Sequence, residues 1–274
     1  MIIFTEMREL HSKHCRSNDT IEIPIGINEA NTMETIKLCE KADQHVLISG
    51  YAGSGKSTLL HNILCNALLD YSPQDLQFYL MDSGLFEFGP FADKLVPHIW
   101  KSCLADTPES VSKMLCEINT ELSRREALLY QNGCCSIHEF NKLQIGSRIP
   151  RTLVMMDCSN QFICTVFRNM ENSQLFAELL SKASALGMMF VLSGHDDILI
   201  KSVPFSQLQL FGVRILTHQG SDSAYLLLQD RQFAEKARFL RCGEAIINIP
   251  TPHVFNVPYI DRQTENGIID ESII

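Results

Sequence analysis

The sequence has no long hydrophobic run. Its best apolar stretches, such as Leu186–Ser193, are short and interrupted, whereas a membrane-spanning helix needs about 18 or more apolar residues. The first segment, Met1–His14, mixes charged and apolar residues and so lacks the basic start and apolar centre of a secretory signal. We therefore expect this chain neither to cross a bilayer nor to be exported.

Positive charge is also scarce, because 23 Lys and Arg stand against 32 Asp and Glu and give a formal net charge of −9. Proteins that hold duplex DNA neutralise its phosphates with a basic surface. The charge balance disfavours DNA as a partner, although it is compatible with a local basic patch.

Several familiar signatures are missing as well. The sequence has no internal repeat and no low-complexity tract, which disfavours a solenoid or a propeller. The ten cysteines form no paired C-x-x-C sets, so zinc is not indicated, and we expect reduced thiols in a cytosolic compartment. With 45% hydrophobic and 20% charged residues, the 274-residue chain has the composition of a folded protein, and we expect one compact unit.

Apolar and polar residues alternate over Thr20–Ile27 and again over Thr32–Leu38, which predicts an N-terminal β-hairpin. Short apolar strands then alternate with helical segments along the rest of the chain. The predicted strands are His45–Ser49, Leu76–Met81, Thr152–Met156, Met188–Leu192 and Val213–Thr217, and the predicted helices include Ser57–Leu69 and residues 109–132. This order predicts an α/β fold with a mostly parallel central sheet and helices on both faces.

The segment Gly50–Ser57 matches the phosphate-binding pattern of glycine, four residues, glycine, lysine and serine or threonine, and it lies between a predicted strand and a predicted helix. Its glycines let successive N–H groups point at phosphate oxygens. We expect Lys56 to reach the β- and γ-phosphates and Ser57 to offer its hydroxyl to Mg²⁺. The alternative is a glycine-rich turn without nucleotide. The predicted nucleotide-binding residues are Gly50, Tyr51, Ala52, Gly53, Ser54, Gly55, Lys56, Ser57 and Thr58.

A predicted strand ends at Asp157, which is followed by Cys158. A carboxylate at a strand end can hold the water shell of Mg²⁺, so Asp157 joins Ser57 as a predicted metal residue, with a turn-forming aspartate as the alternative. Many motor ATPases with such a phosphate-binding loop have a glutamate directly after this aspartate, where it deprotonates the attacking water. This chain has Cys158 at that position. Loss of a general base removes about 10² to 10⁴ in rate and spares phosphate binding. We therefore predict nucleotide binding with slow hydrolysis.

Two more carboxylates, Asp82 and Glu87, are candidates for a place near the γ-phosphate. A strand-end turn is the favoured interpretation for Asp82, and a solvated helix residue is favoured for Glu87. No catalytic residue is therefore assigned.

With these residues in place, the sequence resembles the FtsK/SpoIIIE family of RecA-like motor ATPases from about Ile23 to Ile260. The similar blocks are Ile23–Ile27, His45–Gly50 with the following loop, Leu95–Ile99, Glu121–Arg125, and Phe140-Asn141 followed by Ile149-Pro150. Within the family, Tyr79–Gly84 and Gly133–Asn141 are most similar to the ATPase domains of the EssC/EccC proteins, the membrane-anchored motors of bacterial type VII secretion.

This resemblance implies a RecA-like P-loop domain that binds ATP and Mg²⁺. It implies that residues 1–20 are a linker or arm, 21–262 the ATPase domain and 263–274 a polar tail that is a candidate for disorder. The module is expected to be a fragment of a longer motor or its C-terminal ATPase domain.

The resemblance also implies partners and a location. The implied partners are other ATPase domains of the same motor and WXG100-type secreted proteins, with homo-oligomers as a further option. The membrane would be reached only through other parts of a longer chain. The implied location is the cytoplasm, at the inner face of the cell membrane.

The sequence departs from the family at Leu192–His195, which replaces the threonine–glutamine sensor of the γ-phosphate. His195 is a candidate substitute, although a surface or turn histidine is favoured. In the wider family a neighbouring subunit contributes an arginine to the ATP site, and for each candidate a solvated or structural role is favoured. These candidates are Arg124, Arg125, Arg214, Arg238 and Arg241.

Three functions follow from these features. The first is a nucleotide-binding module of a type VII secretion motor with weak or absent hydrolysis, acting in substrate docking, assembly or regulation. The second is an active FtsK/SpoIIIE-type DNA translocase, which the net charge and Cys158 disfavour. The third is an interaction domain that has abandoned nucleotide, which the intact Lys56 and Ser57 disfavour.

Overall fold

The computed structural model describes residues 2–11, 20–38, 45–83, 87–104, 107–143 and 147–273. Its centre is a ten-stranded sheet with the order β2-β1-β10-β9-β8-β3-β7-β6-β4-β5. The strands are β1 (Ile21–Asn28), β2 (Met33–Leu38), β3 (Val46–Gly50), β4 (Leu76–Asp82), β5 (Ile99–Leu104), β6 (Arg151–Asp157), β7 (Met188–His195), β8 (Val213–Leu216), β9 (Glu244–Ile247) and β10 (His253–Asn256).

The sheet has a parallel part and an antiparallel flank. The strands from β8 to β5 pair in parallel, whereas β9, β10, β1 and β2 continue the sheet in antiparallel pairs. The predicted α/β class and the predicted N-terminal hairpin, β1 with β2, are confirmed. The strands β5, β9 and β10 were not expected from the sequence.

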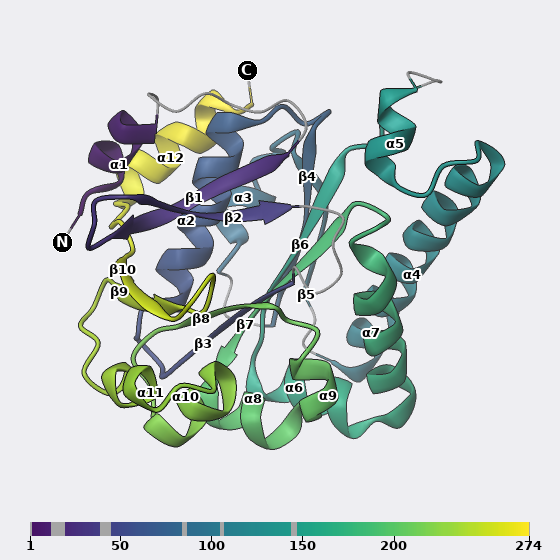
Figure 1. Ribbon diagram of the computed structural model, residues 1–274. Coiled ribbons are helices and arrows are strands. Elements are labelled where there is room, and N and C mark those ends of the chain that lie inside the picture. Colours follow the sequence, from purple (N-terminus) through teal and green to yellow (C-terminus); the bar gives the residue numbers. More distant parts are fainter. Residues whose placement is uncertain are drawn as a thin grey trace.

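The helices are α1 (Phe4–His11), α2 (Lys56–Asp70), α3 (Gly89–Ala92), α4 (Pro108–Gln131), α5 (Ile137–Lys142), α6 (Asn160–Arg168), α7 (Met170–Ala183), α8 (Asp196–Ser202), α9 (Phe205–Leu208), α10 (Ser221–Leu228), α11 (Arg231–Ala237) and α12 (Arg262–Glu271). Figure 1 shows α4 and α7 on one side of the sheet, and α1, α2 and α12 on the other. None of the helices in the described ranges is long and apolar enough to span a membrane.

Each face of the sheet carries its own hydrophobic core, because side chains along a strand alternate between the two faces. In β6, Leu153 and Met155 pack into the core beneath α2, whereas Val154 and Met156 pack into the core beneath α4 and α7. The continuous apolar runs of these strands therefore reflect burial on both faces.

The two ends of the described chain pack against this body. Ile3 forms a parallel bridge with Tyr259, and the α1 residues Phe4 and Met7 are buried. The expectation of a disordered tail after residue 262 is wrong, because these residues form α12, whose Ile268 and Ile269 are buried against α2 and the sheet. Part of the expected N-terminal arm, residues 12–19, lies outside the described residues.

Candidate functional site

The loop between β3 and α2 lies at the carboxyl edge of the parallel strands. The strand registers bring the ends of four strands together there, because Gly50 pairs with His195, Ser49 with Leu216 and Asp157 with Ser193. All nine residues predicted to bind nucleotide lie in this one segment, which begins at the end of β3 and enters the first turn of α2. Ligands of open parallel sheets bind at this edge.

The three loop glycines have two different physical roles. Gly53 and Gly55 have φ angles of +72° and +99°, a left-handed conformation that favours glycine. Gly50 is required for close approach, since a Cβ atom there would lie 1.9 Å from Thr217 Oγ1 and 2.6 Å from Ser54 Oγ. Those two hydroxyls are themselves 2.6 Å apart. The end of β8 thus supports the loop through Thr217, a residue that the sequence analysis did not single out.

Replacing Gly50 by alanine is expected to destabilise the domain by about 1 to 3 kcal/mol, because the new methyl group overlaps the Ser54–Thr217 pair. Chemical denaturation of purified protein measures this change. Gly89→Ala is the matched control, because a Cβ at Gly89 meets nothing within 4 Å. Equal stability of the two variants would contradict the expected clash.

Lys56 folds over the loop that precedes it. Its Nζ donates hydrogen bonds to the carbonyl oxygens of Gly50 at 3.0 Å and Tyr51 at 2.7 Å. Burial lowers the pKa of this lysine, while the negative charges of Asp157 and Asp196 oppose the shift. The lysine therefore lies between the loop and two buried carboxylates.

Asp157 lies at the end of β6 in an acidic neighbourhood. Its pKa is raised to about 6, first by burial and then by the negative charges of Glu87 and Asp82. The side chains of Lys56 and Ser193 act in the opposite direction. Asp82 accepts a hydrogen bond from the backbone N–H of Phe88, at 3.3 Å.

The favoured sequence interpretation of Glu87 as a solvated helix residue is wrong. Glu87 precedes α3 and has less than a quarter of its side chain exposed. Its pKa is lowered, first by the interaction with His61, whose Nε2 lies 3.2 Å from Glu87 Oε1. Glu87 therefore pairs with the residue one helical turn after Ser57 and acts electrostatically on Asp157.

The side chains at this edge fit Mg²⁺ bound together with phosphates. In the described ranges, no group of three His, Cys, Asp or Glu side chains could hold a metal ion by itself. Mg²⁺ in nucleotide sites is commonly held by one or two protein ligands, phosphates and water. Ser57 offers a hydroxyl ligand, and the nearby carboxylates of Asp157, Glu87 and Asp82 repel one another. A divalent cation would neutralise part of this negative charge.

Cys158, next to Asp157 in the chain, has its side chain in the hydrophobic core. The residue is 8% exposed and belongs to the core formed with Phe162 and Val166 of α6. Its backbone N–H donates to Ser193 O at 2.9 Å, and burial raises the pKa of the thiol far above its usual range. The thiol of Cys158 therefore packs as a core side chain.

A second group of polar residues flanks the loop on the β7 and β8 side. Asp196 is 1% exposed, forms an ion pair with His195 at 3.1 Å, and accepts from the backbone N–H of Gly220. Gln219 is fully buried, and its amide atoms lack a hydrogen-bond partner in the described structure. Tyr51 stacks 5.8 Å from His195, so this histidine lies beside the loop and is not an isolated surface residue.

Two of the five candidate arginines are structural. Arg125 is 2% exposed and donates to Leu186 O, Gly187 O and Thr152 Oγ1. Arg214 donates to carbonyl oxygens of residues 208, 211 and 227. Their donors are used within the domain, so neither is available to a neighbouring subunit.

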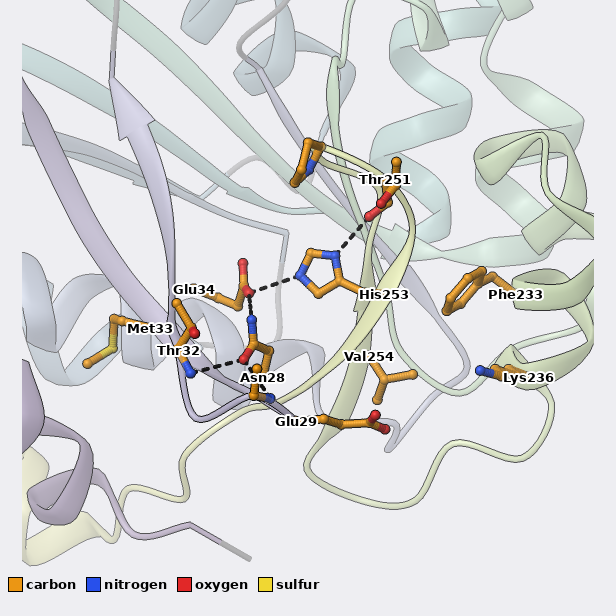
Figure 2. Close-up of a pocket in the computed structure, with 12 residues that line it drawn as sticks. Asn28, Glu29, Thr32, Met33, Glu34, Phe233, Lys236, Thr251, His253 and Val254 are labelled. Atoms are coloured by element: carbon orange, nitrogen blue, oxygen red, sulfur yellow. Dashed lines mark hydrogen bonds and ion pairs between the residues drawn. The ribbon is translucent and has the colours of Figure 1, made fainter.

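A cavity of about 550 Å³ lies elsewhere, between the β1–β2 turn, the β9–β10 turn and α11. Figure 2 shows Glu34 between His253, at 2.9 Å, and Asn28, at 2.7 Å, with Phe233 and Lys236 on the α11 side. None of the residues predicted to bind nucleotide lines this cavity. The contact between Glu34 and His253 joins the β1–β2 hairpin to β10.

The elements at the carboxyl edge define a class of protein. A strand, a glycine-rich loop with lysine and serine, a helix, and an aspartate at the end of a nearby parallel strand are the parts of a P-loop ATPase domain. The FtsK/SpoIIIE family model matches residues 8–224, and the chain belongs to this family.

Two curated relatives illustrate the range of the family. The type VII secretion system protein EssC of Staphylococcus aureus (strain MRSA252) is 26% identical over 211 residues, which are 76% of this chain and 14% of EssC. The DNA translocase SftA of Bacillus subtilis (strain 168) is 25% identical over 181 residues, which are 65% of this chain and 18% of SftA. The chain thus spans less than a fifth of either relative.

Solved structures confirm the fold. The cytoplasmic domain of the Thermomonospora curvata type VII secretion ATPase EccC has a TM-score of 0.77 and 18% identity, over 95% of this chain and 32% of that one. ATPases 2 and 3 of T. curvata EccC, in complex with a signal sequence peptide, have a TM-score of 0.70 and 19% identity, over 93% of this chain and 46% of that one. The predicted resemblance to EssC/EccC ATPase domains is confirmed.

Proposed function

We propose that this chain is an ATP-binding module of a type VII protein secretion motor, with weak or absent hydrolysis. Its role would be substrate docking, assembly or regulation within that motor. One observation best supports this proposal. Lys56, Ser57 and Asp157 are present at the carboxyl edge of the sheet, whereas the position of the usual glutamate is occupied by Cys158, which is buried in the core.

In this proposal the segment from Gly50 to Thr58 surrounds the phosphates of ATP. Lys56 would exchange its bonds with the loop carbonyls for phosphate oxygens, and backbone N–H groups at the start of α2 would add further donors. Ser57 would hold Mg²⁺ directly and Asp157 would hold it through water. The bound Mg²⁺ would neutralise charge on the phosphates and on the neighbouring carboxylates.

The partners are proposed from the relatives. EssC and EccC contain more than one ATPase domain, so the proposed neighbours are other ATPase domains of the same motor or further copies of this chain. A signal sequence peptide bound to EccC suggests secreted proteins of the WXG100 type as substrates. The proposed location is the cytoplasmic face of the cell membrane, reached through other parts of a longer chain.

Nucleotide affinity tests the proposal. Lys56→Ala is expected to weaken Mg²⁺-ATP binding by about 10- to 100-fold, because it removes a charge-assisted contact of roughly 1.5 to 3 kcal/mol. Isothermal titration calorimetry measures the loss, and Lys201→Ala, at an exposed ion pair on α8, is the control. A wild-type domain that binds no ATP would refute the proposal and favour an interaction domain without nucleotide.

A second candidate, an active DNA translocase, is favoured by the similarity to SftA. The net charge of −9 opposes it. Single-turnover hydrolysis and duplex binding, followed by fluorescence anisotropy, separate the two functions. Brisk hydrolysis together with duplex binding would favour the translocase.

A further inference from the structure

His61 connects the nucleotide-binding helix with the last helix of the described chain. It lies one helical turn after Ser57 on α2. Its Nε2 is 3.2 Å from Glu87 Oε1, and its Nδ1 contacts Oε1 of Glu265 on α12. The His61 and Glu265 side chains are at most 15% exposed. The imidazole is thus enclosed between two carboxylates and packs edge-on against Phe91, with the ring centroids 5.5 Å apart.

Glu87 faces the predicted metal site on its other side. Ser57 lies one turn before His61 on the same face of α2, so Glu87, which pairs with His61, lies on the side of Ser57. The negative charge of Glu87 also acts on Asp157. Glu87, His61 and Glu265 therefore form a series of polar contacts beside Ser57, which we name the His61 bridge. The bridge runs from the P-loop helix to α12.

The charge of the bridge is not balanced internally. One imidazolium neutralises one carboxylate, so the two glutamates around His61 retain a negative charge. A single carboxylate would suffice for a structural ion pair with His61. His61 forms its hydrogen bond with Glu265, so the surplus charge is assigned to Glu87, which acts on Asp157. A divalent cation beside Ser57 would neutralise it.

We propose that Glu87 is a second carboxylate of the Mg²⁺ site, and that His61 and Glu265 hold it in position. This inference rests on the proposed function, because it assumes that Mg²⁺-ATP binds at the P-loop. Glu87 adds negative charge beside Ser57, and α12 sets its place through His61. Helix α12 is thereby part of the support of the nucleotide site.

The test compares ATP affinity in excess Mg²⁺ with ATP affinity in EDTA, by calorimetry. In Glu87→Gln the Mg²⁺-dependent gain in affinity is expected to fall about tenfold, in the range for residues that support a metal site. ATP affinity in EDTA is expected to be unchanged or higher, because the variant removes a negative charge near the phosphates. Glu265→Gln is expected to reduce the Mg²⁺-dependent gain by a smaller factor.

Two exposed residues provide matched controls, Asp93→Asn after α3 and Glu271→Gln on α12. Thermal unfolding without nucleotide verifies that each variant is folded. A wild-type protein that binds no ATP would overturn the proposed function and this inference together. Wild-type Mg²⁺ dependence preserved in a folded Glu87→Gln would overturn this inference alone. Full Mg²⁺ dependence in Glu265→Gln would overturn the assignment of His61 and Glu265.

Discussion

Replacing Cys158 by glutamate is expected to destabilise the domain by about 3 to 5 kcal/mol, without creating a faster ATPase. The sequence comparison alone suggests the opposite, a gain of the missing general base. In the structure, however, the side chain at position 158 lies in the core beneath α6, where the thiol donates a weak hydrogen bond to Met156 O, at 3.6 Å. The larger carboxyl group would overfill this space and lack hydrogen-bond partners.

Urea denaturation at two pH values measures this effect. Burial would raise the pKa of the new carboxyl group above its value in the unfolded chain, so the loss of stability is expected to grow as the pH rises from 5 to 8. Cys116→Glu, at an exposed cysteine of α4, is the matched control and is expected to be nearly neutral. Normal stability with faster hydrolysis in Cys158→Glu would show that position 158 reaches the nucleotide.

Arg125→Ala is expected to lower the free energy of unfolding by about 3 to 5 kcal/mol, as for other broken buried ion pairs. The guanidinium joins α4 to the start of β6 and to the turn before β7, through Thr152 Oγ1 and the carbonyl oxygens of Leu186 and Gly187. It also pairs with Glu121 at 2.8 Å. Its removal leaves these acceptors without their donor.

The neighbouring arginine offers a control within the same helical turn. Arg124 pairs with the same Glu121, but more than half of its side chain is exposed. Arg124→Ala is therefore expected to cost less than about 1 kcal/mol. Chemical denaturation of both variants measures the difference. Similar losses in the two would contradict the structural role assigned to Arg125.

The sequence predicts the parts of the fold that depend on local patterns. A short apolar run predicts β3, the glycine pattern predicts the P-loop, and apolar residues at helical spacing predict α2. The end of another apolar run predicts that a strand ends at Asp157. The strands β9 and β10, in the antiparallel part of the sheet, have four residues each and were not predicted. Helix α12 could have been predicted from Asp261, a good N-cap residue, followed by the apolar pair Ile268 and Ile269.

Contacts between distant segments explain what the sequence could not predict at the site. Glu87, His61 and Glu265 meet only after α2, the segment before α3 and α12 have packed together. Thr217 reaches the P-loop only because β8 pairs with β3. The side-chain direction of Cys158 likewise depends on how α6 covers the end of β6. No spacing rule along the chain contains this information.

The position of β3 in the sheet bears on when the nucleotide site forms during folding. Val46 pairs with Val191 on one side and with Val213 on the other, whereas β1 pairs with the adjacent β2. Hairpins close within microseconds, but pairings between distant segments must first overcome the entropy of a long loop. On a ribosome, the hairpin is synthesised before β3, and β3 gains both of its neighbours only after residue 216 has been added. A nucleotide that binds the finished loop would then favour chains in which β7 and β8 have already paired with β3.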